Sequence, residues 1–134
     1  MAGTNFRKQG EAGASVERIF TDLCEGEIDL VVASANGTFI DAAERAAVLR
    51  NCPGAKVYAM KSALGESVGA SSLWQTICGA QSLRTQLVPP DLPLPKEDAV
   101  RLPAERKSNE QFRRAVISVC GLNQQVAGLR LVSN

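Results

Sequence analysis

The apolar run Ile28–Ser34 and the two segments that follow it constrain the fold most strongly. The run reads IDLVVAS and is rich in β-branched residues, which favours a strand buried on both faces, as in parallel sheets. Residues 35–38 have the composition of a turn, and Asp41 begins an alanine-rich helical segment that Pro53-Gly54 ends. Lys56–Met60 is a second short strand, so strand, helix and strand together predict a βαβ unit.

Further elements are predicted on both sides of this unit. They are helices over Ala14–Cys24 and Ser71–Leu83, and strands over Thr85–Val88, Arg114–Cys120 and Val126–Val132. The last two strands should pair antiparallel as a hairpin. An irregular loop is expected over residues 91–109. Residues 1–13 are polar and contain glycine, so we expect a flexible N-terminal arm, followed by one domain over residues 14–134.

The composition excludes several classes of partner. The formal net charge is +1 and only 4% of the residues are aromatic, so neither nucleic acid nor an anionic membrane is expected as a partner. The sequence has no apolar run of about 18 residues, so no spanning helix is expected. The N-terminal segment has no apolar core of a secretory signal, and we therefore expect a cytoplasmic protein.

The chain contains no histidine, which excludes much chemistry. Ser–His–Asp and Cys–His catalysis cannot operate within it, so a general base must be a carboxylate, Lys61 or a group from a partner. The four cysteines are Cys24, Cys52, Cys78 and Cys120. Their scattered spacing does not match a zinc site. We therefore expect reduced, buried cysteines and neither a metal nor a cofactor.

Small residues crowd the segment Lys61–Trp74, which reads KSALGESVGASSLW and follows a predicted strand. A strand, a small-residue turn and a helix often form a site, because the helix start offers free N–H groups. The wording resembles the K-x-x-x-G-H-x-x-G-A segment of the β-ketoacyl-acyl carrier protein synthases, condensing enzymes of the thiolase superfamily. The matching residues are Lys61, Gly65, Gly69 and Ala70. Glu66 stands where that family has its second catalytic histidine.

Other segments resemble the same family in the same order. Ile28–Thr38 is similar to a strand that ends in A-H-G-T-G-T, with Asn36 at the first catalytic histidine. The remaining matches are Asp41 and Glu44 with G-D-x-x-E, Leu87–Pro90 with an I-P-P turn, and Ala115–Leu131 with the closing hairpin. The resemblance covers the C-terminal half of a synthase. In the family, the nucleophilic cysteine belongs to the other half.

The resemblance implies roles for three residues. In the family the two histidines assist decarboxylation and donate hydrogen bonds to the developing oxyanion. The amide of Asn36 can still donate, whereas an ionised Glu66 cannot, and it could instead pair with Lys61. Lys61 would act structurally and electrostatically at such a site. Simpler interpretations stay open: a solvated or structural Lys61, an Asn36 that forms a turn, and a Glu66 that caps the following helix.

The resemblance also implies an acyl-pocket or gating loop at Gly121, Leu122 and Asn123. Gly121 is retained, but Asn123, Gln124, Gln125 and Val126 replace the glycines and the threonine–asparagine pair of the family. Cys120 ends the preceding strand. Without a histidine partner we expect it to be a packing residue rather than a reactive thiol.

The fold implied is α/β, a thiolase-like half domain with a mainly parallel sheet, an antiparallel C-terminal hairpin and helices on both faces. Three functions stay open. The first is a ketosynthase-like subunit of fatty-acid or polyketide assembly, non-catalytic alone and acting as an auxiliary or chain-length-factor-like partner. The second is one piece of a split β-ketoacyl synthase, an acyltransferase completed by a cysteine-bearing chain. The third is a non-acyl scaffold module. The replaced histidines favour the first.

The expected partners follow from the same resemblance. The apolar character of the helix over residues 71–83 indicates that it is covered by the sheet on one side and by another subunit or domain on the other. The candidate partners are a companion ketosynthase subunit or a second copy of this chain, with acyl carrier protein as a further candidate.

Overall fold

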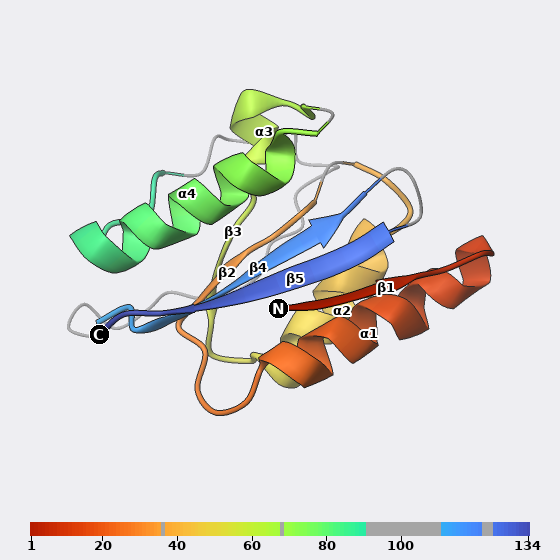
Figure 1. Ribbon diagram of the computed structural model, residues 1–134, viewed down its shortest axis with the longest axis horizontal. Helices are drawn as coiled ribbons and strands as arrows, with labels where there is room; N and C mark the ends of the chain where they lie inside the picture. Colours follow the sequence, from red (N-terminus) through yellow and green to blue (C-terminus); the bar gives the residue numbers. More distant parts are fainter. Residues whose placement is uncertain (36, 68, 91–110, 122–124) are drawn as a thin grey trace.

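The computed structural model describes residues 1–35, 37–67, 69–90, 111–121 and 125–134. A five-stranded sheet with the strand order β1-β5-β4-β2-β3 lies between two layers of helices (Figure 1). The strands are β1 (Ala2–Asn5), β2 (Leu30–Val32), β3 (Lys56–Tyr58), β4 (Arg114–Cys120) and β5 (Gln125–Val132). The helices are the short 3-10 helix η1 (Gln9–Glu11), α1 (Ala12–Leu23), α2 (Asp41–Asn51), α3 (Lys61–Leu64) and α4 (Ser71–Thr85).

The strand pairing confirms the predicted α/β class. Strand β2 pairs parallel with both β3 and β4, and Val31 lies between Val57 and Val116. Strands β4 and β5 form the predicted antiparallel hairpin, with Ile117 opposite Leu129. The pair of β1 and β5 is also antiparallel, so the parallel strands form one half of the sheet and the antiparallel strands the other.

The N-terminal segment differs from the flexible arm that the sequence predicts for residues 1–13. Residues 2–5 form β1, which pairs with β5 and gives the sheet one of its edges. Phe6 then inserts into the core and is buried, and η1 leads directly into α1. The sequence AGTN carries no strong strand pattern, because an edge strand is fixed by hydrogen bonds to its neighbour rather than by apolar side chains.

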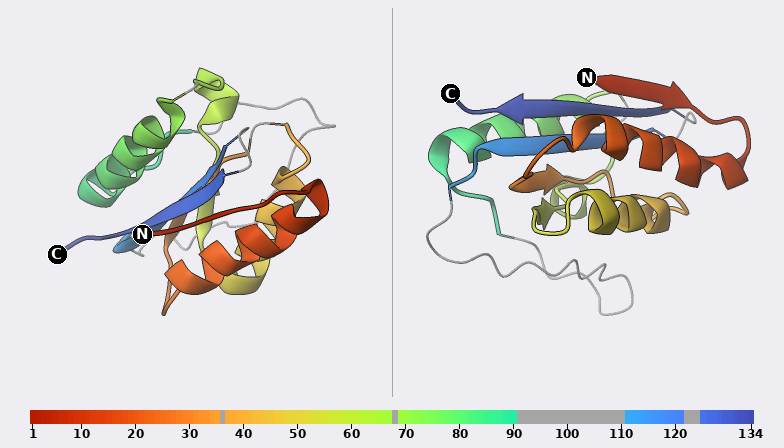
Figure 2. Two further views of the ribbon diagram at one scale, coloured as in Figure 1. Left: turned by 45° about the vertical axis from the view of Figure 1, so that its right-hand side comes forward. Right: turned by 90° about the horizontal axis from the view of Figure 1, so that it is seen from below.

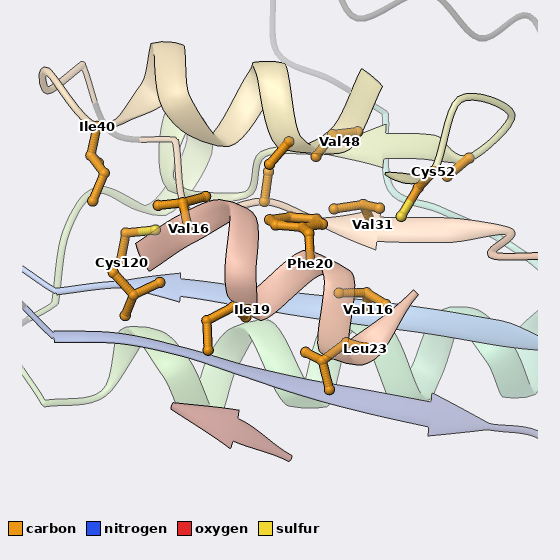
Figure 3. Packing of buried hydrophobic residues seen from close by; sticks show 14 of the residues in the cluster. Val16, Ile19, Phe20, Leu23, Val31, Ile40, Val48, Cys52, Val116 and Cys120 are labelled. Carbon is orange, nitrogen blue, oxygen red and sulfur yellow. The ribbon is translucent and has the colours of Figure 1, made fainter. Parts of the chain in front are cut away.

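Helices α1 and α2 cover one face of the sheet. The apolar face of α1 consists of Val16, Ile19, Phe20 and Leu23, all buried. Figure 3 shows Phe20 among Val31 of β2, Val48 of α2 and Val116 of β4. Burial of a side chain of this size contributes about 1.5–3 kcal/mol. The close approach of α1 to β5 requires Gly128, because a Cβ there would collide with Leu23 and Ile19.

Helix α4 covers the opposite face of the sheet (Figure 2). It turns mostly small and polar residues toward the sheet: its buried residues are Gln75, Gly79, Ser82 and one large apolar residue, Leu83. Leu73, Trp74 and Ile77 point away and are 62%, 52% and 41% exposed. The predicted apolar face of this helix is therefore the face that the sheet leaves uncovered.

The cysteines differ in part from the expectation of reduced thiols. Cys24 and Cys52 form a disulfide, with their Cα atoms 6.5 Å apart. Cys24 follows the last residue of α1 and Cys52 follows the last residue of α2. The two helices lie side by side and run in the same direction, so their C-terminal ends meet (Figure 1). Cys78 and Cys120 are free thiols, as expected.

The segment after α4 also differs from its prediction. Thr85 ends α4, and no strand forms over residues 85–88 of the described chain. Gln86 has a left-handed backbone, with φ of 61°, which stops the helix. Its side-chain amide then bonds both the N–H and the C=O of Phe112, at 2.6 and 3.0 Å, in place of a strand ladder. The predicted loop over residues 91–109 lies outside the described residues.

Candidate functional site

A buried polar cluster lies at the carboxyl ends of the three parallel strands. Ser34 comes two residues after β2, Lys61 begins α3 after β3, and Cys120 ends β4. Parallel strands present their carboxyl ends at one edge of the sheet, and in α/β proteins ligands bind outside that edge. The sheet topology therefore brings together residues that are far apart in the sequence.

Ser34 is the centre of this cluster. Its hydroxyl oxygen accepts hydrogen bonds from the Lys61 ammonium, at 3.0 Å, and from the backbone N–H of Cys120, at 2.9 Å. Its backbone N–H donates to the Glu44 carboxyl oxygen at 2.8 Å. All four residues are buried. Ser34 thus holds Lys61 in place while its own hydroxyl is enclosed, so we assign it a positioning role rather than that of a nucleophile.

Glu44 of α2 is a carboxyl group inside the protein. Burial raises its pKa from the usual value of 4.5 to about 7, against the opposing effects of its hydrogen bonds with Ser118 and Ser34 and of the nearby Lys61 charge. Near pH 7 both protonation states are therefore populated. Glu44 therefore carries only part of a negative charge near pH 7, and it neutralises the Lys61 ammonium only in part.

Lys61 and Glu66 form an ion pair with Nζ and Oε2 2.7 Å apart. The Lys61 side chain is 4% exposed and that of Glu66 is 29% exposed. The other carboxylate oxygen accepts a hydrogen bond from the Ser71 hydroxyl at 2.6 Å, and Ser71 is the first residue of α4. The predicted pairing of Glu66 with Lys61 is confirmed.

Two glycines shape the loop that brings Glu66 to Lys61. Gly65 and Gly69 have φ of 72° and 81°, a conformation that favours glycine over other residues. Gly65 also ends α3, where its N–H donates to the Lys61 carbonyl at 2.8 Å. The four-residue spacing of these glycines, visible in the sequence, is therefore a requirement of the backbone.

A hollow of about 320 Å³ opens beside this ion pair. It is lined by Met60, Lys61, Leu64, Gly65, Ser67, Ser71 and Trp74. A second, open groove of about 550 Å³ continues along α4 toward residues 87–90 and shares Met60, Leu64 and Trp74 with the hollow. The hollow and the groove form one largely apolar surface, and the buried ammonium of Lys61 lies at one end of it.

The other predicted site residues are less informative. Asn36, Leu122 and Asn123 lie outside the described residues. Gly121 is described, and its N–H donates to the Gln125 carbonyl at 2.8 Å, next to the end of β4. Burial raises the pKa of the Cys120 thiol to about 12, so it stays protonated at neutral pH. This agrees with a packing residue.

Sequence reasoning missed the role of Gln75. Its side-chain N–H groups donate to the carbonyls of Ala33 and Ser118, both at 2.9 Å, and thus tie α4 to the ends of β2 and β4. It is completely buried. The signal was the helical spacing of small and polar residues at positions 75, 79 and 82, which marks a close, polar contact with the sheet.

Two classes of feature are absent from the described parts of the chain. No helix there is long and apolar enough to cross a membrane. The described residues also contain no group of three or more His, Cys, Asp or Glu side chains arranged to hold a metal ion.

Comparison with known proteins matches most of the chain to one family. Residues 7–94 match the family described as beta-ketoacyl synthase, C-terminal domain. The 3-oxoacyl-(acyl-carrier-protein) synthase 2 of Mycobacterium tuberculosis is 42% identical over 88 residues, which are 62% of this chain and 21% of that protein. The protein of the same name from Mycobacterium leprae is 40% identical over 95 residues, or 67% of this chain and 22% of that protein. The chain spans about a fifth of the length of these relatives.

Proposed function

The chain belongs to the family of β-ketoacyl synthase C-terminal domains, and from this premise we propose that it is an auxiliary, chain-length-factor-like subunit that is non-catalytic alone. The resemblance predicted from the motifs is thereby confirmed, and the α/β sheet with helices on both faces fits a thiolase-like half domain. The match ends at residue 94, so the resemblance of the β4–β5 hairpin to the family's closing hairpin stays a prediction.

The outer face of α4 supports this function. Leu73, Trp74 and Ile77 expose a continuous apolar surface, and Leu64 and Leu87 beside it are 66% and 72% exposed. Exposed apolar patches of this kind mark interaction sites. The occupant we propose for this face is a companion ketosynthase subunit, which would also supply the nucleophile that the family carries in its other half.

The ion pair at the candidate site supports the non-catalytic part of the proposal. Lys61 is engaged by Glu66 and Ser34, and an ionised Glu66 has no hydrogen to donate to an oxyanion. The motif resemblance places Glu66 at the second catalytic histidine of the family, and an ionised carboxylate there accepts hydrogen bonds but does not donate them. The chain would shape an acyl pocket for its partner rather than perform the reaction.

Co-purification with a cysteine-bearing ketosynthase tests the partner. We expect a stable complex with the wild-type chain, loss of the complex with Trp74→Lys, and retention with Leu49→Lys. Leu49 is a matched control because it is an exposed leucine, 45% accessible, on α2 at the other face of the sheet. No complex with the wild-type chain, or equal loss with both variants, would reject the docking surface.

A split ketosynthase is the second candidate, and the buried Lys61–Ser34–Glu44 cluster favours it. Such a cluster retains titratable groups at the strand ends, where active sites are found. Malonyl-carrier decarboxylation by the mixture distinguishes the two. Activity of the complex that falls with Lys61→Met supports a split enzyme, whereas activity unaffected by that change supports the auxiliary subunit.

A further inference from the structure

We propose that the Glu66 carboxylate occupies, from within the chain, a carboxylate-binding position formed by Lys61 and Ser71, and that it closes the hollow beside Trp74 to carboxylate ligands. Glu66 is then a specificity-determining residue of this pocket. The inference rests on the contacts within the chain, and it does not depend on the partner proposed above.

Both oxygens of the carboxylate are held in the manner of a bound ligand. Oε2 lies 2.7 Å from the Lys61 ammonium, and Oε1 accepts a hydrogen bond from the Ser71 hydroxyl at 2.6 Å. A charged donor on one oxygen and a hydroxyl on the other fix both the charge and the orientation of a carboxylate. The chain therefore presents a complete small-carboxylate site with its own side chain in it.

The burial of Lys61 explains why an anion is needed at this position. Its side chain is almost fully buried, and a buried ammonium is costly without an anionic partner. Ser34 supplies a neutral acceptor, and Glu44 is partly protonated near neutral pH because burial raises its pKa to about 7. Glu66 is thus the main counter-charge of Lys61.

The hollow gives external ligands access to the same groups. Lys61 and Ser71 both line it, and Trp74 forms part of its wall. A carboxylate that entered beside Glu66 would place another negative charge next to Lys61, which Glu66 has already neutralised. The wild-type pocket should therefore reject carboxylates, and removal of the Glu66 side chain should expose the binding position.

Rescue by acetate tests this inference. In the full chain with Glu66→Ala, acetate at constant ionic strength should raise the melting temperature saturably and change the fluorescence of Trp74, which is the only tryptophan. At 100 times its Kd, a ligand that binds only the folded state raises the ratio of folded to unfolded chains about 100-fold. Acetamide, the neutral analogue, should have no such effect, and the wild-type chain should not respond to acetate.

Further variants separate a specific site from a general salt effect. Lys61→Met in the Glu66→Ala background should abolish the response. Glu25→Ala removes a carboxylate that is 93% exposed and should create no response to acetate. If Glu66→Ala does not fold, Glu66→Ser provides the same vacancy with a small polar group. Two results would overturn the proposal. One is an equal response to acetate in the wild-type chain and in the variant that lacks the Glu66 carboxylate, and the other is a folded variant of this kind that does not respond.

Discussion

At the scale of single residues, Glu44 makes the free energy of unfolding depend on pH. Its pKa is about 7 in the folded chain and 4.5 when the group is exposed, so the folded state binds the proton more tightly than the unfolded state. The resulting stabilisation is fully present below about pH 4.5. It is lost progressively as the pH rises from about 4.5 through 7, because over this range the unfolded chain has released a proton that the folded chain retains.

Glu44→Gln should remove this dependence, because an amide of the same size carries no titrating proton. The pKa difference corresponds to about 3 kcal/mol of unfolding free energy between pH 4.5 and 8. Urea unfolding at both pH values should show a decrease that is larger in the wild-type chain than in the variant by about this amount. Glu27→Gln, at an exposed glutamate, is the control and should behave as wild type. Identical pH profiles for all three chains would contradict the burial argument.

The residues of the site differ in how far the sequence predicts them. Lys61 and Glu66 are five positions apart and joined by a glycine turn, so their pairing follows from local chemistry. The contact of Ser34 with Cys120 spans 86 positions and exists only because β2 and β4 are neighbours in the sheet. Local patterns cannot supply such contacts, which is why Ser34 and Gln75 were not predicted.

At the scale of elements, the packing of α1 on β5 depends on a missing side chain. Gly128→Ala should destabilise the chain by about 1–3 kcal/mol, because the new methyl group collides with Leu23 and Ile19 in a filled core. Gly3→Ala, in the paired strand β1, is the matched control: its Cβ would make contacts of 3.8 Å or longer. Denaturant unfolding of both variants tests this, and equal stabilities would show that α1 shifts without cost.

The Cys24–Cys52 disulfide is a second feature at this scale. It closes a loop with a sequence separation of 28, for which the chain-entropy model gives about 3–4 kcal/mol of stabilisation. Reduction should lower the free energy of unfolding by this order. The double variant Cys24→Ala with Cys52→Ala should be insensitive to reductant. Thiol titration of the denatured, oxidised chain should find Cys78 and Cys120 alone, and four reactive thiols would contradict the disulfide.

Elements with strong side-chain patterns were predicted, and those fixed by their neighbours were not. The β-branched runs in β2 and β4 and the apolar face of α1 report burial directly. Strand β1 depends on its pairing with β5, which four small and polar residues do not reveal. Conversely, the left-handed Gln86 prevents a strand in a segment whose composition favours one.

At the scale of the whole molecule, the two faces of the sheet are covered unequally. Helices α1 and α2 cover one face, where α1 buries its apolar side chains and α2 buries Ala47 and Val48, whereas α4 exposes most of its own. The chain alone should therefore associate reversibly at high concentration through the outer face of α4. Sedimentation over a concentration series should show a rising mass for wild type and a smaller rise for Ile77→Lys, with unchanged melting temperature. A constant monomer mass for wild type would contradict this expectation.

The two amide hydrogen bonds of Gln75 have a consequence for the motions of the domain. Helix α4 is held to the sheet by these bonds and by Leu83 as its one large buried apolar side chain, whereas α1 buries Val16, Ile19, Phe20 and Leu23. Segments with few buried apolar contacts open locally at lower free energy than the core. The amides of α4 should exchange with deuterium faster than those of α1, and Gln75→Ala should widen the difference. Helix α4, whose outer face is the candidate docking surface, is then the helix with the lowest free energy of local opening. Binding of a partner to this face should therefore slow hydrogen exchange in α4.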